Sequence, residues 1–165
     1  MNLRGVVDSS FLYNAYQMDL LPILCKVFEK LILVPSVVSE CVRFHDQLRL
    51  LKCAEEIKLS PYEVEEVKKL HSFFTESFPG KHHGEIECLV VANVRKENLV
   101  ISDNFAPWYL QKHLQGYHNV DIYRGWWIIG HFIENNELPL EFLDKLEGRY
   151  PKKALTNLRR TLKDE

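Results

Sequence analysis

The sequence lacks any hydrophobic run long enough to cross a bilayer. Its longest apolar stretches, such as residues 31–38, fall far short of the ~20 residues that a transmembrane helix needs. The amino end reaches charged residues at Arg4 and Asp8 before a secretory apolar region could form. We therefore expect a cytoplasmic protein that does not associate with membranes.

The sequence also lacks a cysteine motif. Its four cysteines are widely spaced and make no C-x-x-C pair, which does not favour a zinc site or a disulfide framework. We expect four reduced thiols, most of them buried, at Cys25, Cys41, Cys53 and Cys88.

Neither a glycine-rich phosphate loop nor an excess of positive charge is present. The net charge of −2 argues against a general coat for nucleic acid, because neutralising phosphates takes clustered Lys and Arg. The stretch 149–165 is rich in Lys and Arg, and it is either a solvated helical face or a local basic surface. A phosphatase of the haloacid-dehalogenase kind would need an aspartate where Ser10 stands.

What the sequence does contain is an alternation of short apolar runs with longer helical patterns, which is typical of a parallel sheet covered by helices. Strands are expected at 4–8, 31–34, 57–59, 99–102 and 120–123, and the first, second and fourth are apolar enough to be central. No repeat or linker interrupts the pattern, so residues 1–165 are expected to form one α/β domain.

Helices are expected between and after these strands. Their ranges are 11–17, 19–30, 35–44, 47–56, a longer helix from Pro61, 84–96, 105–115, 125–137, 139–147 and 152–163. The helix at 84–96 is almost wholly apolar in its middle, so we expect it in the interior against the sheet. The two terminal helices, within 139–163, are expected to pack on the domain or extend it.

Four acidic residues are expected at one rim of this sheet. Asp8 and Asp103 end the first and fourth strands, and the carboxyl ends of parallel strands line the ligand crevice of such a sheet. Glu40 and Glu85 lie near the starts of two helices that stand over the same ends. Each acid has an ordinary alternative, such as helix capping by Asp8 or interaction with the helix dipole by Glu85. Glu87 points about 200° away from Glu85, which we prefer for the site.

Carboxylates gathered in this way favour a metal ion. They repel one another, and burying them without a cation is costly. Mg²⁺ or Mn²⁺ prefers such oxygen ligands and can polarise a phosphodiester, activate water and stabilise the leaving oxygen. The acidic residues therefore predict hydrolytic nuclease chemistry.

Four short motifs make the sequence resemble the PIN-domain family over nearly its full length. They are VVDSS at 6–10, VPSVVSE at 34–40, HGEIEC at 83–88 and VISDNF at 100–105. The resemblance implies a three-layer α/β/α sandwich with a central parallel sheet of four to five strands. It also implies an endoribonuclease that cleaves single-stranded RNA with Mg²⁺ or Mn²⁺. The family includes toxins with antitoxin partners, and its members commonly form homodimers.

The resemblance also assigns roles to residues. It implies catalysis by Asp8, Glu40, Glu85 and Asp103, metal ligation by these four and Asn104, and support of the first carboxylate by Ser9. In many relatives an acid directly precedes the aromatic residue of the fourth motif, and here Asn104 stands in that place. This departure leaves open a second function, that of a catalytically weak or inactive module that binds RNA or protein.

Two other groups of residues have both an ordinary and a functional interpretation. His82 and His83 are expected in an ordinary polar loop. Of the two functional alternatives, contact of Lys81, His82 and His83 with substrate phosphates is favoured slightly over metal binding. Trp126 and Trp127 lie at helical spacing with apolar residues, which favours a place in the core or at an interface over base stacking.

Overall fold

The computed structural model describes residues 3–77, 82–147, 152 and 156. Within them, five parallel strands form one sheet in the order β3-β2-β1-β4-β5. The strands are β1 (Leu3–Val7), β2 (Phe28–Leu33), β3 (Ala54–Glu56), β4 (Leu99–Ile101) and β5 (Asp121–Tyr123). The predicted α/β class with a parallel sheet of four to five strands is confirmed.

The three central strands are those whose sequences are most apolar. Val6 of β1 pairs with Ile32 of β2 on one side and with Val100 of β4 on the other. All three side chains are buried, as the continuous apolar runs predicted.

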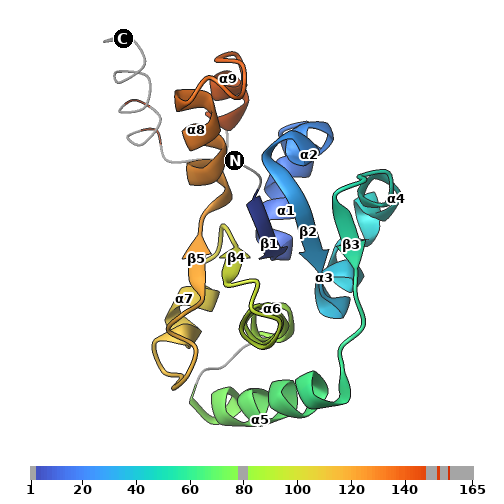
Figure 1. Ribbon diagram of the computed structural model, residues 1–165, viewed down its shortest axis with the longest axis vertical. Helices are drawn as coiled ribbons and strands as arrows, with labels where there is room; N and C mark the ends of the chain where they lie inside the picture. The colour runs from blue at the N-terminus through green and yellow to red at the C-terminus, as the bar shows by residue number, and fades with distance from the viewer. Residues whose placement is uncertain (1–2, 78–81, 148–151, 153–155, 157–165) are drawn as a thin grey trace.

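Helices flank the sheet, as the predicted sandwich requires (Figure 1). They are α1 (Ser9–Gln17), α2 (Leu24–Val27), α3 (Pro35–Glu40), α4 (His45–Arg49), α5 (Pro61–Ser77), α6 (His83–Val94), α7 (Ala106–Gln111), α8 (Gly125–Glu134) and α9 (Phe142–Leu146). No helix of the described ranges is long and apolar enough to cross a membrane. The helix predicted at 152–163 lies outside the described residues except for positions 152 and 156.

The interior helix is α6, as its composition predicted. It contacts β1 and β4 on one side, and α5 lies on its outer side (Figure 1). Its residues from Ile86 to Ala92 are buried. Because α3 also contacts α6, the start of α6 lies close to the ends of β1 and α3, where the acidic motifs are found.

Two predicted segments were wrong at the edge of the sheet. The strand predicted at 57–59 is instead Ala54–Glu56, which replaces the second half of the helix predicted at 47–56. β3 pairs with β2 alone and its residues are exposed or half-buried, so this edge strand needs no apolar pattern.

Two predicted helices also end early. The one predicted at 19–30 is a 3-10 turn (Leu21–Ile23) and the short α2, after which β2 begins at Phe28. A continuous apolar run does not distinguish a buried helix from a buried strand, which explains the error. The helix predicted at 35–44 ends at Glu40 and is followed by a 3-10 turn (Val42–Phe44).

The expectation of four reduced thiols was wrong for one pair. Cys25 of α2 and Cys53, directly before β3, form a disulfide, while Cys41 and Cys88 are buried free thiols. The two paired residues are 28 positions apart and belong to no motif, so their sequence spacing gave no signal. Disulfides are typical of oxidising compartments, and the cytoplasmic location stays a prediction.

Candidate acidic site

Asp8 directly follows β1, and its side chain does not cap the helix that follows. It occupies the N-cap position of α1 without a side-chain capping hydrogen bond. Its Oδ2 instead accepts hydrogen bonds from the hydroxyls of Ser10 (2.8 Å) and Ser102 (2.7 Å). The carboxylate is 2% exposed and is therefore held at the adjoining ends of β1 and β4.

Glu40 and Asp8 approach the first turn of α6 at Gly84. A Cβ atom at this glycine would stand 3.2 Å from Glu40 Oε1 and 3.8 Å from Asp8 Oδ1. The glycine therefore leaves room for both carboxylates beside the helix start. Acidic side chains from β1 and α3 thus meet next to the residue that precedes Glu85.

The charges of these residues act on Glu85. Burial, followed by the negative charge of Asp8, raises the pKa of Glu85 to about 7, and Glu40 adds to the increase. A helix amino end normally favours a carboxylate, so burial and like charge outweigh the helix dipole here. Burial together with Glu40 and Asp8 also raises the pKa of the Cys41 thiol to about 12.

Neutral groups, and not cations, contact the other carboxylates. The Ser9 hydroxyl donates a hydrogen bond to Glu40 Oε2, and the Asn104 side-chain amide donates one to Glu85 Oε1 (3.4 Å). Across the described part of the chain, no lysine or arginine forms an ion pair with Asp8, Glu40 or Glu85. The negative charges therefore lack a balancing cation from these residues.

Sequence reasoning missed the roles of the two serines that hold Asp8. Ser9, which was expected to support the first carboxylate, contacts Glu40, while Ser10 and Ser102 contact Asp8. The signal was present in the sequence, because both serines belong to motifs that end strands. A single sequence does not reveal which hydroxyl of VVDSS turns toward which acid.

The neighbours Asp103 and Asn104 point in different directions. The two carboxylate oxygens of Asp103 accept hydrogen bonds from Asn14 Nδ2 and from the backbone N–H of Gly125, both at 2.8 Å. Asp103 thereby links α1 to the start of α8. Asn104 faces Glu85, and its Oδ1 accepts a hydrogen bond from the backbone N–H of Ala106.

Glu87 and the histidines have other contacts. Glu87 Oε2 accepts a hydrogen bond from the backbone N–H of Ser36, in the first turn of α3, and burial raises the pKa of Glu87.

The His83 ring stacks on His71 with the centroids 4.3 Å apart. His82 Nδ1 is buried and has no hydrogen-bond partner among the described residues. Lys81 lies outside the described residues.

The two tryptophans differ in exposure. Trp126 is half-buried, whereas Trp127 is 48% exposed and stacks on Tyr123 with the centroids 4.9 Å apart. The apolar residues at helical spacing with them, Ile128, Ile129 and Phe132, are buried. Trp126 packs against the core, as one of the two interpretations predicted, whereas a place of Trp127 at an interface stays a prediction.

The acidic residues have the chemistry of a site for a hard divalent cation. Within residues 3–77 and 82–147, no three His, Cys, Asp or Glu side chains are grouped closely enough to hold a metal ion as they stand. Asp8, Glu40 and Glu85 nevertheless offer only carboxylate oxygens, which Mg²⁺ and Mn²⁺ prefer. Glu40 Oε1 and Asp8 Oδ1 both lie within 4 Å of the position that a Cβ at Gly84 would take, so these oxygens and Glu85 suit such an ion by their chemistry.

A comparison with protein families gives a match over residues 4–107, to the model of a family described as a PIN domain. The matched range contains Asp8, Glu40, Glu85 and Asn104, whereas β5, α8 and α9 lie beyond it. No curated protein matches the chain.

Proposed function

The chain belongs to the PIN-domain family, typically a family of nucleases, and on that premise we propose that it is a metal-dependent endoribonuclease acting on single-stranded RNA. One observation carries the proposal. Asp8 and Glu40 approach the first turn of α6, and burial, together with the charges of Asp8 and Glu40, raises the pKa of Glu85 to about 7. Mutual repulsion of this kind destabilises a fold, and perturbed carboxylates of this kind are typical of functional sites.

Asp8, Glu40 and Glu85 are the ligands in this proposal, and Mg²⁺ or Mn²⁺ is the ion. When bound, the ion supplies a Lewis acid for the phosphodiester and lowers the pKa of a bound water. Ser10 and Ser102 hold Asp8 Oδ2, so Oδ1 is the oxygen left for the ion. Ser9 positions Glu40 in the same way. Glu85 would hold the ion as a carboxylate, because ligands bind in their deprotonated form.

Asn104 and Asp103 have different roles in this proposal. Asn104 contributes an uncharged group beside Glu85, and it takes the place that the fourth motif gives to a ligand. Asp103 is a positioning residue, because its carboxylate orients Asn14 and the start of α8. Its loss is therefore expected to act on the arrangement of the site.

A second candidate function is a PIN-fold module that binds RNA or protein without cleaving it. The contacts of Asn104 favour it, because its side-chain oxygen accepts a hydrogen bond from Ala106 and the group that it presents to Glu85 is an uncharged amide. Under both candidate functions we propose two protein partners, an antitoxin and a second copy of the chain, on the basis of the family.

The test is cleavage of a labelled single-stranded RNA in Mg²⁺ or Mn²⁺, with and without a chelator. We expect cleavage that the chelator abolishes and that Asp8→Asn and Glu85→Gln each remove. Glu87→Gln is the matched control, because it makes the same change on the same helix and keeps an acceptor for Ser36. Cleavage that survives the chelator would refute the metal mechanism. Binding without cleavage in either metal would favour the second function.

A further inference from the structure

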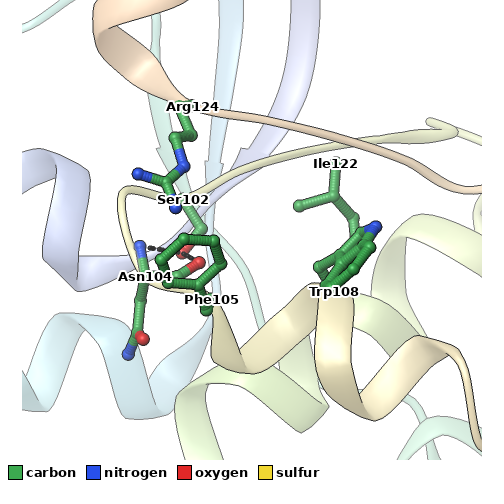
Figure 2. Close-up of a pocket in the computed structure, with 6 residues that line it drawn as sticks. All are labelled: Ser102, Asn104, Phe105, Trp108, Ile122 and Arg124. Atoms are coloured by element: carbon green, nitrogen blue, oxygen red, sulfur yellow. Dashed lines mark hydrogen bonds between the residues drawn. The ribbon is translucent and has the colours of Figure 1, made fainter.

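A small pocket adjoins the acidic site on the side of β4 and β5. It has a volume of about 200 Å³ and is lined by Ser102, Asn104, Phe105, Trp108, Ile122 and Arg124. Figure 2 shows Phe105 with Arg124 on one side of the space and Trp108 with Ile122 on the other. The residues come from the β4–α7 segment, α7 and the β5 region, and three of them, Trp108, Ile122 and Arg124, lie beyond the range matched to the family.

The pocket and the acidic site share a wall. Ser102 lines the pocket and donates a hydrogen bond to Asp8, while Asn104 lines it and donates one to Glu85. A group that fills the pocket therefore lies next to whatever the carboxylates bind. This continuity ties the occupant of the pocket to the substrate of the site.

The walls of the pocket combine exposed aromatic rings with cations. The Phe105 and Trp108 side chains are 67% and 47% exposed. The Arg124 guanidinium lies 3.9 Å from the centroid of the Phe105 ring, and Lys112 Nζ lies 3.5 Å from that of Trp108. No acid among the described residues forms an ion pair with Arg124 or Lys112. Aromatic faces beside free positive charge are the surface on which single-stranded nucleic acids stack their bases.

The size of the pocket and of the neighbouring hollow indicates which kind of ligand the pocket can bind. It is smaller than the ~300–1,000 Å³ clefts that hold drug-sized ligands, which suits a single planar group. A second hollow of about 430 Å³ shares Trp108 and Ile122 with it and continues to Lys112, His118 and Tyr123. A strand with one base in the first pocket would thus have a continuing path along α7 and β5.

We propose that the pocket between Phe105 and Trp108 binds one unpaired base of the RNA strand whose phosphate lies at Asp8, Glu40 and Glu85. The inference rests on the proposed function and adds the part of the substrate that the site recognises. Stacking accepts any base, so the pocket selects for single strands over duplexes and only weakly for sequence.

The test is binding of a fluorescein-labelled single-stranded RNA, measured by anisotropy in Mn²⁺ with Glu85→Gln as the uncleaving parent. We expect Trp108→Ala or Phe105→Ala to weaken binding by about 5- to 150-fold, the range for loss of one stacked base. Trp108→Phe should restore most of the affinity, because it keeps a ring. Tyr109→Ala is the matched control, because Tyr109 is an exposed aromatic on α7 that does not line either hollow, and it should leave binding unchanged.

Oligonucleotides with a single abasic nucleotide make the test specific. An RNA with one abasic position should bind the parent more weakly than the intact RNA does. In Trp108→Ala the abasic and intact RNAs should bind with the same affinity, because the substitution has already removed the stacking contact. Equal abasic effects in both proteins, unchanged binding by Trp108→Ala and Phe105→Ala, or equally tight binding of double-stranded RNA would each overturn the proposal. Wild-type cleavage, measured separately, distinguishes the two claims. If the wild type cleaves RNA with metal but Trp108→Ala and Phe105→Ala bind RNA as tightly as the parent, only the pocket proposal is refuted. If the abasic effect disappears in Trp108→Ala but the wild type does not cleave, the pocket proposal is supported and the nuclease proposal is refuted.

Discussion

The Glu40 carboxylate lies against the backbone of Gly84, so that a Cβ at residue 84 would stand 3.2 Å from Glu40 Oε1. This contact is tight enough that Glu40 would have to move by a few tenths of an ångström to admit a methyl group. The glycine is thus a spacer between α3 and α6, and it keeps open the space beside Asp8.

Gly84→Ala is expected to weaken metal binding without unfolding the protein. Alanine is favoured over glycine within a helix by ~0.5–1 kcal/mol, which offsets the cost of moving a flexible side chain. Displacing Glu40 should lower the affinity for Mn²⁺ by about 10-fold, as changes around metal ligands commonly do. A calorimetric titration with Mn²⁺ and a thermal unfolding curve measure the two effects. Unaltered Mn²⁺ affinity would mean that Glu40 is not a ligand.

Glu85→Gln is expected to stabilise the metal-free protein at high pH. The pKa of Glu85 rises from 4.5 to about 7 on folding, so between these values the folded protein holds a proton that the unfolded chain has lost. The wild type should therefore lose stability as the pH rises from 4.5 to about 7, and glutamine should not. We expect Glu85→Gln to be more stable by about 2–3 kcal/mol at pH 8 and by almost nothing near pH 4.5.

Urea unfolding in the presence of a chelator measures this pH dependence. A stability difference between Glu85→Gln and wild type that stays constant from pH 5 to pH 8 would show that a raised pKa of Glu85 is not its cause. Glu87→Gln gives a comparison, because burial also raises the pKa of Glu87 but the charge of Asp8 is not among the causes.

Ser102→Ala is expected to reduce both stability and cleavage. The buried hydroxyl donates to Asp8 Oδ2 and accepts from the backbone N–H of Asn104 (3.1 Å). Its removal takes one of the two hydroxyl donors from the buried Asp8 carboxylate, which costs about 1–3 kcal/mol. Ser39→Ala is the matched control, because its hydroxyl bonds only to the Pro35 carbonyl of its own helix. Equal activity of Ser102→Ala and Ser39→Ala would remove Ser102 from the positioning of Asp8.

The roles of Asp103 and Asn104 can be distinguished with the substitutions Asn104→Asp and Asp103→Asn. Asn104→Asp places a charge beside Glu85, so it should destabilise the metal-free protein, tighten Mn²⁺ binding and raise the cleavage rate. Asp103→Asn weakens the charge-assisted bonds to Asn14 and Gly125 and should lower stability by about 1–3 kcal/mol. Metal titrations and cleavage assays measure both. If Asp103→Asn abolishes Mn²⁺ binding in a folded protein, Asp103 is itself a ligand.

The sequence predicted secondary structure best for the elements that are buried on both sides. The carboxyl-end halves of β1 and β2, most of β4 and the middle of α6 have continuous apolar runs, because their side chains are buried on both sides. The edge strand β3, with the sequence Ala-Glu-Glu, carries no such signal. The Cys25–Cys53 disulfide joins distant segments whose proximity depends on the register of β2 and β3.

The sequence predicted that Asp8, Glu40 and Glu85 lie near one another, but it predicted neither the direction of Asp103 nor the contacts that support the acids. Asp8 and Glu85 could be placed because each stands at the end of a strongly patterned element. The partners Ser10 and Ser102 depend on side-chain rotamers, which leave no periodic pattern. The pocket of Phe105, Trp108 and Arg124 combines three segments that meet only in the folded sheet, so no local motif marks it.

The most direct test of the account is the anomalous X-ray signal of manganese in crystals of the wild-type protein soaked in Mn²⁺. We expect a peak in contact with carboxylate oxygens of Asp8 and Glu85, next to Gly84, that is absent from crystals of Asp8→Asn. A soak that leaves Glu40 bound to Ser9 and Glu85 bound to Asn104, with no manganese peak between them, would contradict the account, as would a peak held only by residues outside the acidic site.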